Sequence, residues 1–109
     1  MAEIIVTTGE TVPGCKIVQI LGVAKGNTVR ARNIGRDIGA GFRNLVGGEV
    51  KTYTEMTSQS RDEAFNRMVN EAVSMGADAI IGMRFSTSMV MQGASEMLAF
   101  GTAVKLKKG

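Results

Sequence analysis

Three charged residues in a glycine-rich segment are the first candidates for binding chemistry. Arg36, Asp37 and Arg43 lie among glycines, and Gly47-Gly48 follows them. Two guanidinium groups and successive backbone N–H groups can together hold an anion, because such N–H groups form a concave nest. The segment is not a nucleotide-binding phosphate loop, since residues 35–41 lack the Gly-Lys-Ser/Thr ending that such loops require.

Four further charged residues are spread along the chain: Glu71, Asp78, Arg84 and Glu96. The simplest interpretation of these four, and of Asp37 and Arg43 as well, is pairing in salt bridges with residues of opposite charge within or between subunits. The anion site, which Arg84 also joins, is the alternative. No spacing brings two carboxylates together, so no general acid or base is assigned and we expect no enzyme.

Composition narrows the possible metal chemistry. The chain has no His, eight Met and a single Cys, Cys15. These counts exclude the common zinc sites, a Ser-His-Asp triad, a Cys-His pair and an internal disulfide. Cys15 is therefore a weak alternative metal ligand. The thioethers of Met83, Met89 and Met91 suit Cu(I), but methionines on an alternating strand usually fill a core.

Length and charge predict a single domain over residues 1–109. The net charge of +3 is modest, and the basic cluster of Lys105, Lys107 and Lys108 is interpreted as a solubilising end to an edge strand. We expect no nucleic-acid partner. No apolar run approaches the length of a membrane span, and the first residues do not resemble a signal peptide, so a cytoplasmic protein without membrane contact is expected.

The N-terminal part of the chain is rich in β-branched residues. Residues 3–8 predict a short strand, and Pro13-Gly14 predicts a turn after it. Residues 16–32 predict a strand that is apolar on both faces, which indicates that both faces are covered. Within it, residues 25–28 are either a hairpin turn or a bulge in one long strand, and the pattern leaves both open.

Two helices and a hairpin complete the pattern. Apolar spacing predicts a helix over residues 34–46 after Asn33, and a longer helix over residues 52–75. Residues 79–91 and 96–106 alternate around a glycine turn and predict a β-hairpin. The expected fold is α+β, with helices on one face of an antiparallel sheet and the order β-β-α-α-β-β.

Motifs along nearly the whole chain resemble the YbjQ-like family of small bacterial and archaeal proteins, which carries a heavy-metal-binding label. They occur in the order and at the spacing of that family: Gly22, residues 33–37, residues 43–49, Tyr53-Thr54, Arg61, Ala64, Arg67-Met68, Glu71-Ala72, residues 76–82, Arg84 and residues 100–104. Phe100 departs from the pattern, because a Tyr is frequent there in the family.

The resemblance implies a dodecin-subunit-like fold, assembly into a homopentameric ring, and an uncharacterised function. We therefore expect a non-enzymatic, self-assembling protein that holds a small ligand at its subunit interfaces, with Arg36, Asp37, Arg43, Gly47, Gly48 and Arg84 as the candidate anion site. Dodecins bind flavin, but this chain has no Trp to stack on the flavin ring, so no cofactor is expected. The alternative function is the binding or sequestration of a heavy metal.

Overall fold

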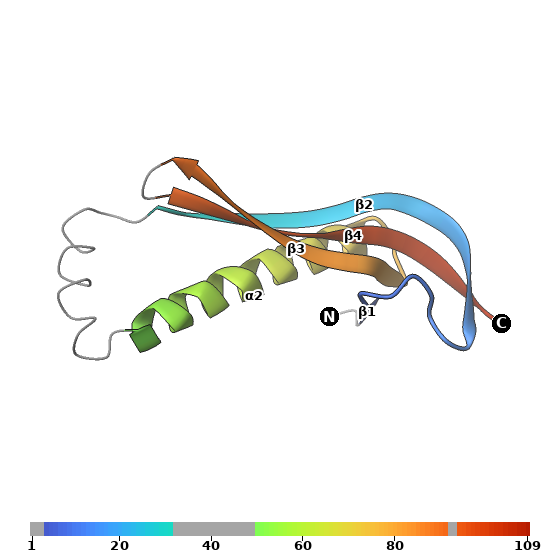
Figure 1. Cartoon of the computed structure of the whole chain (residues 1–109). Coiled ribbons are helices and arrows are strands. Elements are labelled where there is room, and N and C mark those ends of the chain that lie inside the picture. The colour runs from blue at the N-terminus through green and yellow to red at the C-terminus, as the bar shows by residue number, and fades with distance from the viewer. Residues whose placement is uncertain (1–3, 32–49, 92–93) are drawn as a thin grey trace.

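The chain folds as a four-stranded sheet with one long helix packed on one face, in a computed structural model that describes residues 4–31, 50–91 and 94–109 (Figure 1). The elements in chain order are β1 (Ile5–Val6), β2 (Cys15–Ala31), α2 (Val50–Ser74), β3 (Ala79–Met91) and β4 (Ala94–Lys108). The strand order in the sheet is β1-β3-β4-β2. The predicted α+β class and the packing of helix on one face are confirmed.

The sheet is mixed, which corrects the expectation of a purely antiparallel one. β1 runs parallel to β3, with Ile5 beside Ala79 and Val6 beside Ile80, whereas β4 is antiparallel to both β2 and β3. The N–H of Thr7 extends this parallel edge by donating to Ile80 O at 2.9 Å. A two-residue strand that pairs with a distant part of the chain leaves no periodicity in the sequence, so its direction could not be predicted.

The described elements follow the order β-β-α-β-β, which differs from the predicted β-β-α-α-β-β. The predicted helix over residues 34–46 lies outside the described residues. The longer predicted helix, over residues 52–75, corresponds to α2, and Gly76 follows it with φ of +85°, a left-handed conformation that favours glycine. Both predicted hairpin strands are present as β3 and β4.

β2 is one continuous strand, so residues 25–28 are not a hairpin turn. Its register against β4 shifts between Ile17 and Gln19 and again between Ile20 and Gly22. The irregularities therefore precede residues 25–28, and Gly22 has φ of +138°, which a residue with a side chain rarely adopts.

At Gly26 the backbone of β2 closely approaches α2. A Cβ at this position would collide with the backbone of Ala64 and Met68 and would lie 2.6 Å from Arg67 Cβ. Close by, Thr28 Oγ1 donates to Ser60 O at 3.3 Å. Glycine is required here because the helix backbone occupies the space of a side chain.

The core between α2 and the sheet is thin and made mainly of small residues. Ala64, Met68 and Ala72 from α2 are fully buried, and they face five buried residues of the sheet: Ala24, Ile80, Met83, Ala99 and Ala103. A second, smaller cluster of Val12, Ala79 and Val104 involves the β1–β2 connection. Small side chains allow the close approach of α2, but they bury little apolar area per residue.

The molecule is elongated, with principal extents of 56 × 24 × 24 Å and a radius of gyration of 17.5 Å. A compact chain of this length has a radius of gyration of about 13 Å. In the part of the chain that the structure describes, no helix is long and apolar enough to cross a membrane.

Candidate functional site

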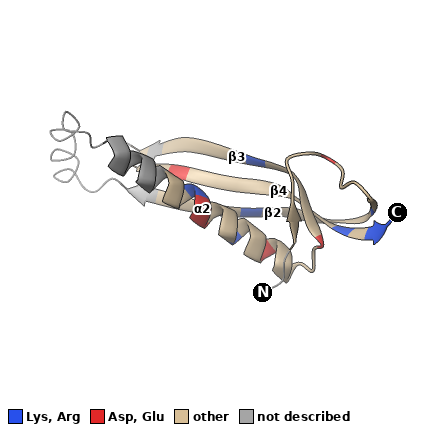
Figure 2. Cartoon of the chain, turned by 90° about the horizontal axis from the view of Figure 1, so that it is seen from below, with Lys and Arg blue, Asp and Glu red and all other residues tan. Residues whose placement is uncertain are grey.

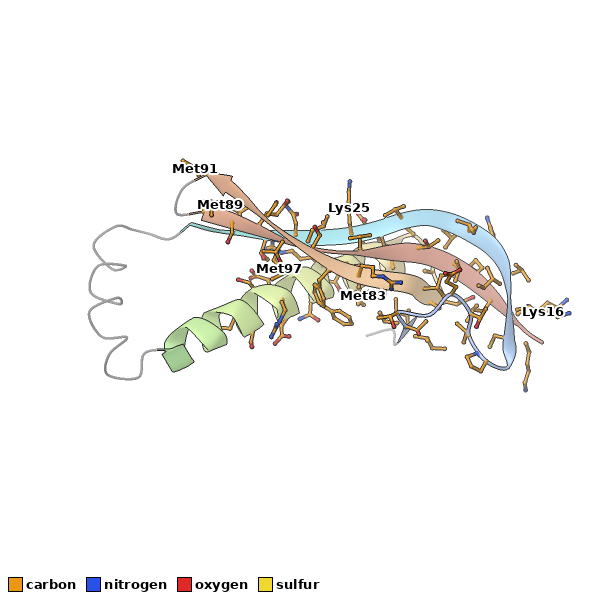
Figure 3. The ribbon with its side chains drawn as sticks, viewed as in Figure 1. Lys16, Lys25, Met83, Met89, Met91 and Met97 are labelled. Carbon is orange, nitrogen blue, oxygen red and sulfur yellow. The ribbon has the colours of Figure 1, made fainter. Side chains whose placement is uncertain are left out.

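The face of the sheet away from α2 carries a row of apolar side chains. Directly paired residues on antiparallel strands point to the same face, so the pairs Ala24–Gly101 and Gly26–Ala99 face the helix. The residues between them face the other way, as Lys25 does in Figure 3. We define the open face as Ile20, Val23 and Val29 of β2 with Leu98 and Phe100 of β4, and Lys25, Asn27, Glu96 and Thr102 lie between them on the same side of the sheet.

No described segment covers the open face. Ile20, Val23 and Val29 are 69%, 61% and 55% exposed, although each is β-branched and apolar. At one end of this side of the sheet, Val12 packs on Ala79 and Val104, and that cover does not extend over the open face. Within the described residues only one face of this strand is covered, so the predicted cover of the second face is not provided by this part of the chain. Exposed β-branched residues interleaved with Lys25 and Asn27 indicate a surface of mixed character that other groups can cover.

The outer edge of β2 is closed by side chains from α2. Glu71 Oε1 accepts a hydrogen bond from the backbone N–H of Lys25 at 2.8 Å, and Arg67 Nη1 donates to Asn27 O at 2.7 Å. Arg67 also pairs with Glu63 on the same helix at 3.9 Å. These bonds satisfy backbone groups that would otherwise be free to pair with another strand.

A second polar contact joins the α2–β3 turn to β4. Asp78 Oδ2 accepts a hydrogen bond from the backbone N–H of Leu106 at 2.8 Å, and Lys105 Nζ lies 3.6 Å from Asp78 Oδ1. Lys105 Nζ also donates to Gly76 O at 3.0 Å. The Leu106 bond, helped by the charge of Lys105, lowers the pKa of Asp78. The contact is structural, and it takes Lys105 out of the predicted basic cluster.

Arg84 is the one member of the predicted anion site within the described residues. Its Nη1 donates to Thr8 O and to Met83 O, both at 2.9 Å, so the guanidinium ties the N-terminal loop to β3. The other predicted members lie outside the described residues: Arg36, Asp37, Arg43, Gly47 and Gly48. Glu96 likewise makes a structural contact, because its Oε2 accepts from Asn27 Nδ2 at 3.0 Å.

The described residues offer no fit for a heavy metal. Cys15 is half-buried at the start of β2, packs against the Val12 cluster and pairs across the sheet with Lys108. Among the side chains that the structure describes, which leave out residues 1–3, 30–57, 90 and 92–93, no three His, Cys, Asp or Glu come together. Cys15 thus has Lys108 and apolar side chains as neighbours. A soft metal ion prefers thiolate and imidazole ligands, which these neighbours do not supply.

The methionines divide into buried and exposed groups. Met68 and Met83 are buried in the core, as the core-filling interpretation predicts. Met89 and Met91 are 76% and 66% exposed at the far end of β3, so this interpretation is wrong for them (Figure 3). The register shift between Ile81 and Arg84 precedes both Met83 and Met89, so these two residues share the α2 face of β3, and Met89 is exposed because no described residue buries it there.

Charged side chains are spread over α2, the strands and the C-terminal end of the chain, and both signs are mixed (Figure 2). Figure 2 shows both signs along α2 and basic residues at the C-terminal end of β4. Lys16 pairs directly with Lys107 there. The exposed apolar residues of the open face are therefore a surface feature that these charges do not explain, and the apolar character of both faces of residues 16–32 was its signal in the sequence.

Comparisons with known proteins agree with these observations. A family model described as "Putative heavy-metal-binding" matches residues 4–107. A UPF0145 protein of Archaeoglobus fulgidus is 57% identical over 105 residues, which cover 96% of this chain and 97% of that protein. A UPF0145 protein of Shewanella frigidimarina is 58% identical over 102 residues, which cover 94% and 95% of the two chains.

A solved structure has a similar fold. It is the crystal structure of a protein of unknown function of the DUF74 family from Pediococcus pentosaceus, with 20% identity and a TM-score of 0.66. The match covers 95% of this chain and 98% of that one. At this identity the likeness concerns the fold alone. The family match and the UPF0145 relatives show that the chain belongs to the YbjQ/UPF0145 family.

Proposed function

We propose that this protein is a non-enzymatic, cytoplasmic, self-assembling protein whose copies form a homopentameric ring. The observation that carries the proposal is the open face, where exposed β-branched side chains lie on a sheet that the described residues cover on one side only. The thin core also supports the proposal, because it is made mainly of small residues while large apolar residues remain at the surface. Burying such a face between copies removes apolar surface from water.

The resemblance to YbjQ-like proteins supports a ring of five single-domain subunits with a dodecin-like fold. A ring needs a heterologous contact, in which two different surfaces of the chain meet. The open face is one such surface. A small anionic ligand held between subunits, by Arg36, Arg43 and their neighbours, completes the proposal.

Sedimentation equilibrium of the wild-type protein and of Val23→Lys tests the role of the open face. Val23 is 61% exposed and points away from the core, so the lysine is tolerated in one chain, where it replaces an apolar contact with a second charge beside Lys25 on the same face. We expect wild type to sediment as an assembly and Val23→Lys to dissociate at least tenfold more readily. Asn70→Lys, on the exposed side of α2, is the matched control and should assemble as wild type does. Equal assembly of all three proteins would overturn the role of the open face.

The second candidate function, heavy-metal binding, is favoured by the description of the matching family. The donor set of the described residues does not support it, so its test is direct. Calorimetric titration with Cu(I), Zn(II) and Cd(II) would support this candidate if binding disappears in Cys15→Ser. Absence of heat with all three ions in the wild-type protein would remove it.

A further inference from the structure

The hydrogen bonds between α2 and β2 show which backbone groups of β2 point away from β4. The strand registers extend this assignment to β4 and β3. Lys25 N–H and Asn27 C=O bond to α2, so these two residues direct their backbone groups away from β4. Backbone groups alternate along a strand, so Gly26 bonds to its partner Ala99. The backbone N–H and C=O of Ala99 therefore point toward β2. Those of its neighbours Leu98 and Phe100 point toward β3.

The same alternation fixes the free groups of β3. Leu98 pairs with Ser86, and Phe100 pairs with Arg84, so these two residues of β3 bond to β4. The residues between and beyond them direct their N–H and C=O groups outward. On this argument the outer edge of β3 presents the backbone groups of Phe85, Thr87 and Met89.

This stretch of edge is unoccupied among the described residues. β1 and the loop after it bond to β3 only as far as Met83, whose N–H donates to Thr7 O at 3.0 Å. Beyond that point, the structure gives no hydrogen bond to the outward backbone groups from Phe85 to Met89 in its described part. The edge of β2 differs, because register shifts interrupt its first half and α2 closes its second half.

The sequence at this edge lacks the usual protection against pairing. Edge strands are normally guarded by charged residues, prolines or bulges. Residues 85–89 read Phe-Ser-Thr-Ser-Met, with no charge and no proline. Phe85 is 44% exposed and Met89 is 76% exposed, and both lie on the face that carries α2, since Phe85 pairs with the helix-facing Ala99.

The segment is symmetric about Thr87 in a way that suits a second copy of itself. A serine flanks Thr87 on each side, and a large apolar residue lies one position further out in each direction. Antiparallel pairing of two such edges about a two-fold axis places Thr87 opposite Thr87 and Phe85 opposite Met89. Thr–Thr and sulfur–aromatic pairs across strands are favourable, and no like charges meet at the centre.

We propose that two copies of this chain pair antiparallel along the outer edges of β3, with a two-fold axis at Thr87. The proposal rests on the proposed ring, which uses the open face, and adds a second contact at a different surface. Five residues of edge make a weak contact alone, but two facing rings form five of them at once, which raises the combined affinity. The assembly is then a pair of pentamers.

Native mass spectrometry measures this assembly directly. Ten chains of 11.5 kDa give about 115 kDa, and five give about 57 kDa. We expect the wild type at about 115 kDa and Thr87→Pro at about 57 kDa, because proline removes an outward N–H and leaves the backbone bonds to β4 intact. Proline also removes the bond from Thr87 Oγ1 to Met97 Sδ at 3.4 Å, and the hydroxyl of Thr87→Ser can keep that bond. Thr87→Ser keeps the N–H and should remain at about 115 kDa. A wild-type mass of about 57 kDa overturns the edge pairing and leaves the ring; a mass of 11.5 kDa overturns both.

A cysteine variant tests the axis without relying on the folding of the proline variant. In a Cys15→Ser background, Thr87→Cys should form an intersubunit disulfide under mild oxidation and stop at covalent dimers, because a two-fold axis joins each cysteine to one partner. Asn70→Cys in the same background lies on the exposed side of α2, away from both proposed contacts, and should stay monomeric on a non-reducing gel. Absence of dimers from Thr87→Cys, or equal dimer formation by both variants, contradicts the proposal.

Discussion

At the scale of single residues, the close approach of the β2 and α2 backbones and a few polar contacts hold the thin core together. Gly26 is the clearest case, since the helix backbone fills the space beside it. Asp78 is the second, since one carboxylate fastens the α2–β3 turn to β4. Neither residue needs a ligand to explain its identity.

We predict that Gly26→Ala destabilises the protein by about 1–3 kcal/mol, because the added methyl group collides with the backbone of α2. Chemical denaturation monitored by circular dichroism measures the free energy of unfolding. Gly9→Ala is the matched control, since the nearest atom to its new Cβ is Thr7 Oγ1 at 3.5 Å, an ordinary contact. A smaller loss for Gly26→Ala than for the control would contradict the close approach.

Asp78 predicts a dependence of stability on pH. Its pKa is lowered from 3.8 on folding, so the folded state binds this proton less readily than the unfolded state does. The contribution to stability is full above the unfolded pKa and is lost as pH falls through the lower folded pKa. In Asp78→Asn the slope of stability between about pH 4 and pH 2 should flatten. Asp62→Asn on α2 serves as the control, and an unchanged slope in Asp78→Asn would refute this role.

At the scale of elements, α2 joins the sheet along β2 and β4 through buried alanines and one large fully buried side chain, Met68, with Phe65 and Val69 partly buried beside it. Met68→Ala should destabilise the protein by about 2–5 kcal/mol, because it removes a fully buried side chain and leaves a cavity. Thermal unfolding measures the effect, with Asn66→Ala on the exposed side of α2 as the control. Losses of similar size in both variants would argue against the packing of α2 through Met68.

Much of the element structure could be predicted from sequence. The long helix and the hairpin were predictable because their periods of 3.6 and 2 run over many residues. The parallel pairing of β1 was not, because a strand of two residues carries no period. The shift between Ile81 and Arg84 was also hidden, since one extra residue reverses the face of all that follows.

The candidate site was less predictable than the fold. Spacing suggested an anion site that included Arg84, whereas the guanidinium bonds to two backbone carbonyls of its own chain. The apolar character of both faces of β2 was visible in the sequence. That the described residues cover only one face depends on how α2 and the β1–β2 loop pack, which is a tertiary property.

At the scale of the whole molecule, the elongated shape and the exposed apolar side chains both favour assembly of several copies. The chain extends 56 Å along one axis, its core is thin, and its sheet exposes an apolar face. Folded monomers rarely leave such a face in water, because burial of apolar surface is the main stabilising term. The central claim is that copies of this chain cover it for one another.

Sedimentation equilibrium of the purified wild-type protein at micromolar concentration tests this claim most directly. The account predicts a mass several times that of the 11.5 kDa chain, with Val23→Lys shifted toward the single chain and Asn70→Lys unchanged. A wild-type mass of 11.5 kDa across the whole concentration range would contradict the account.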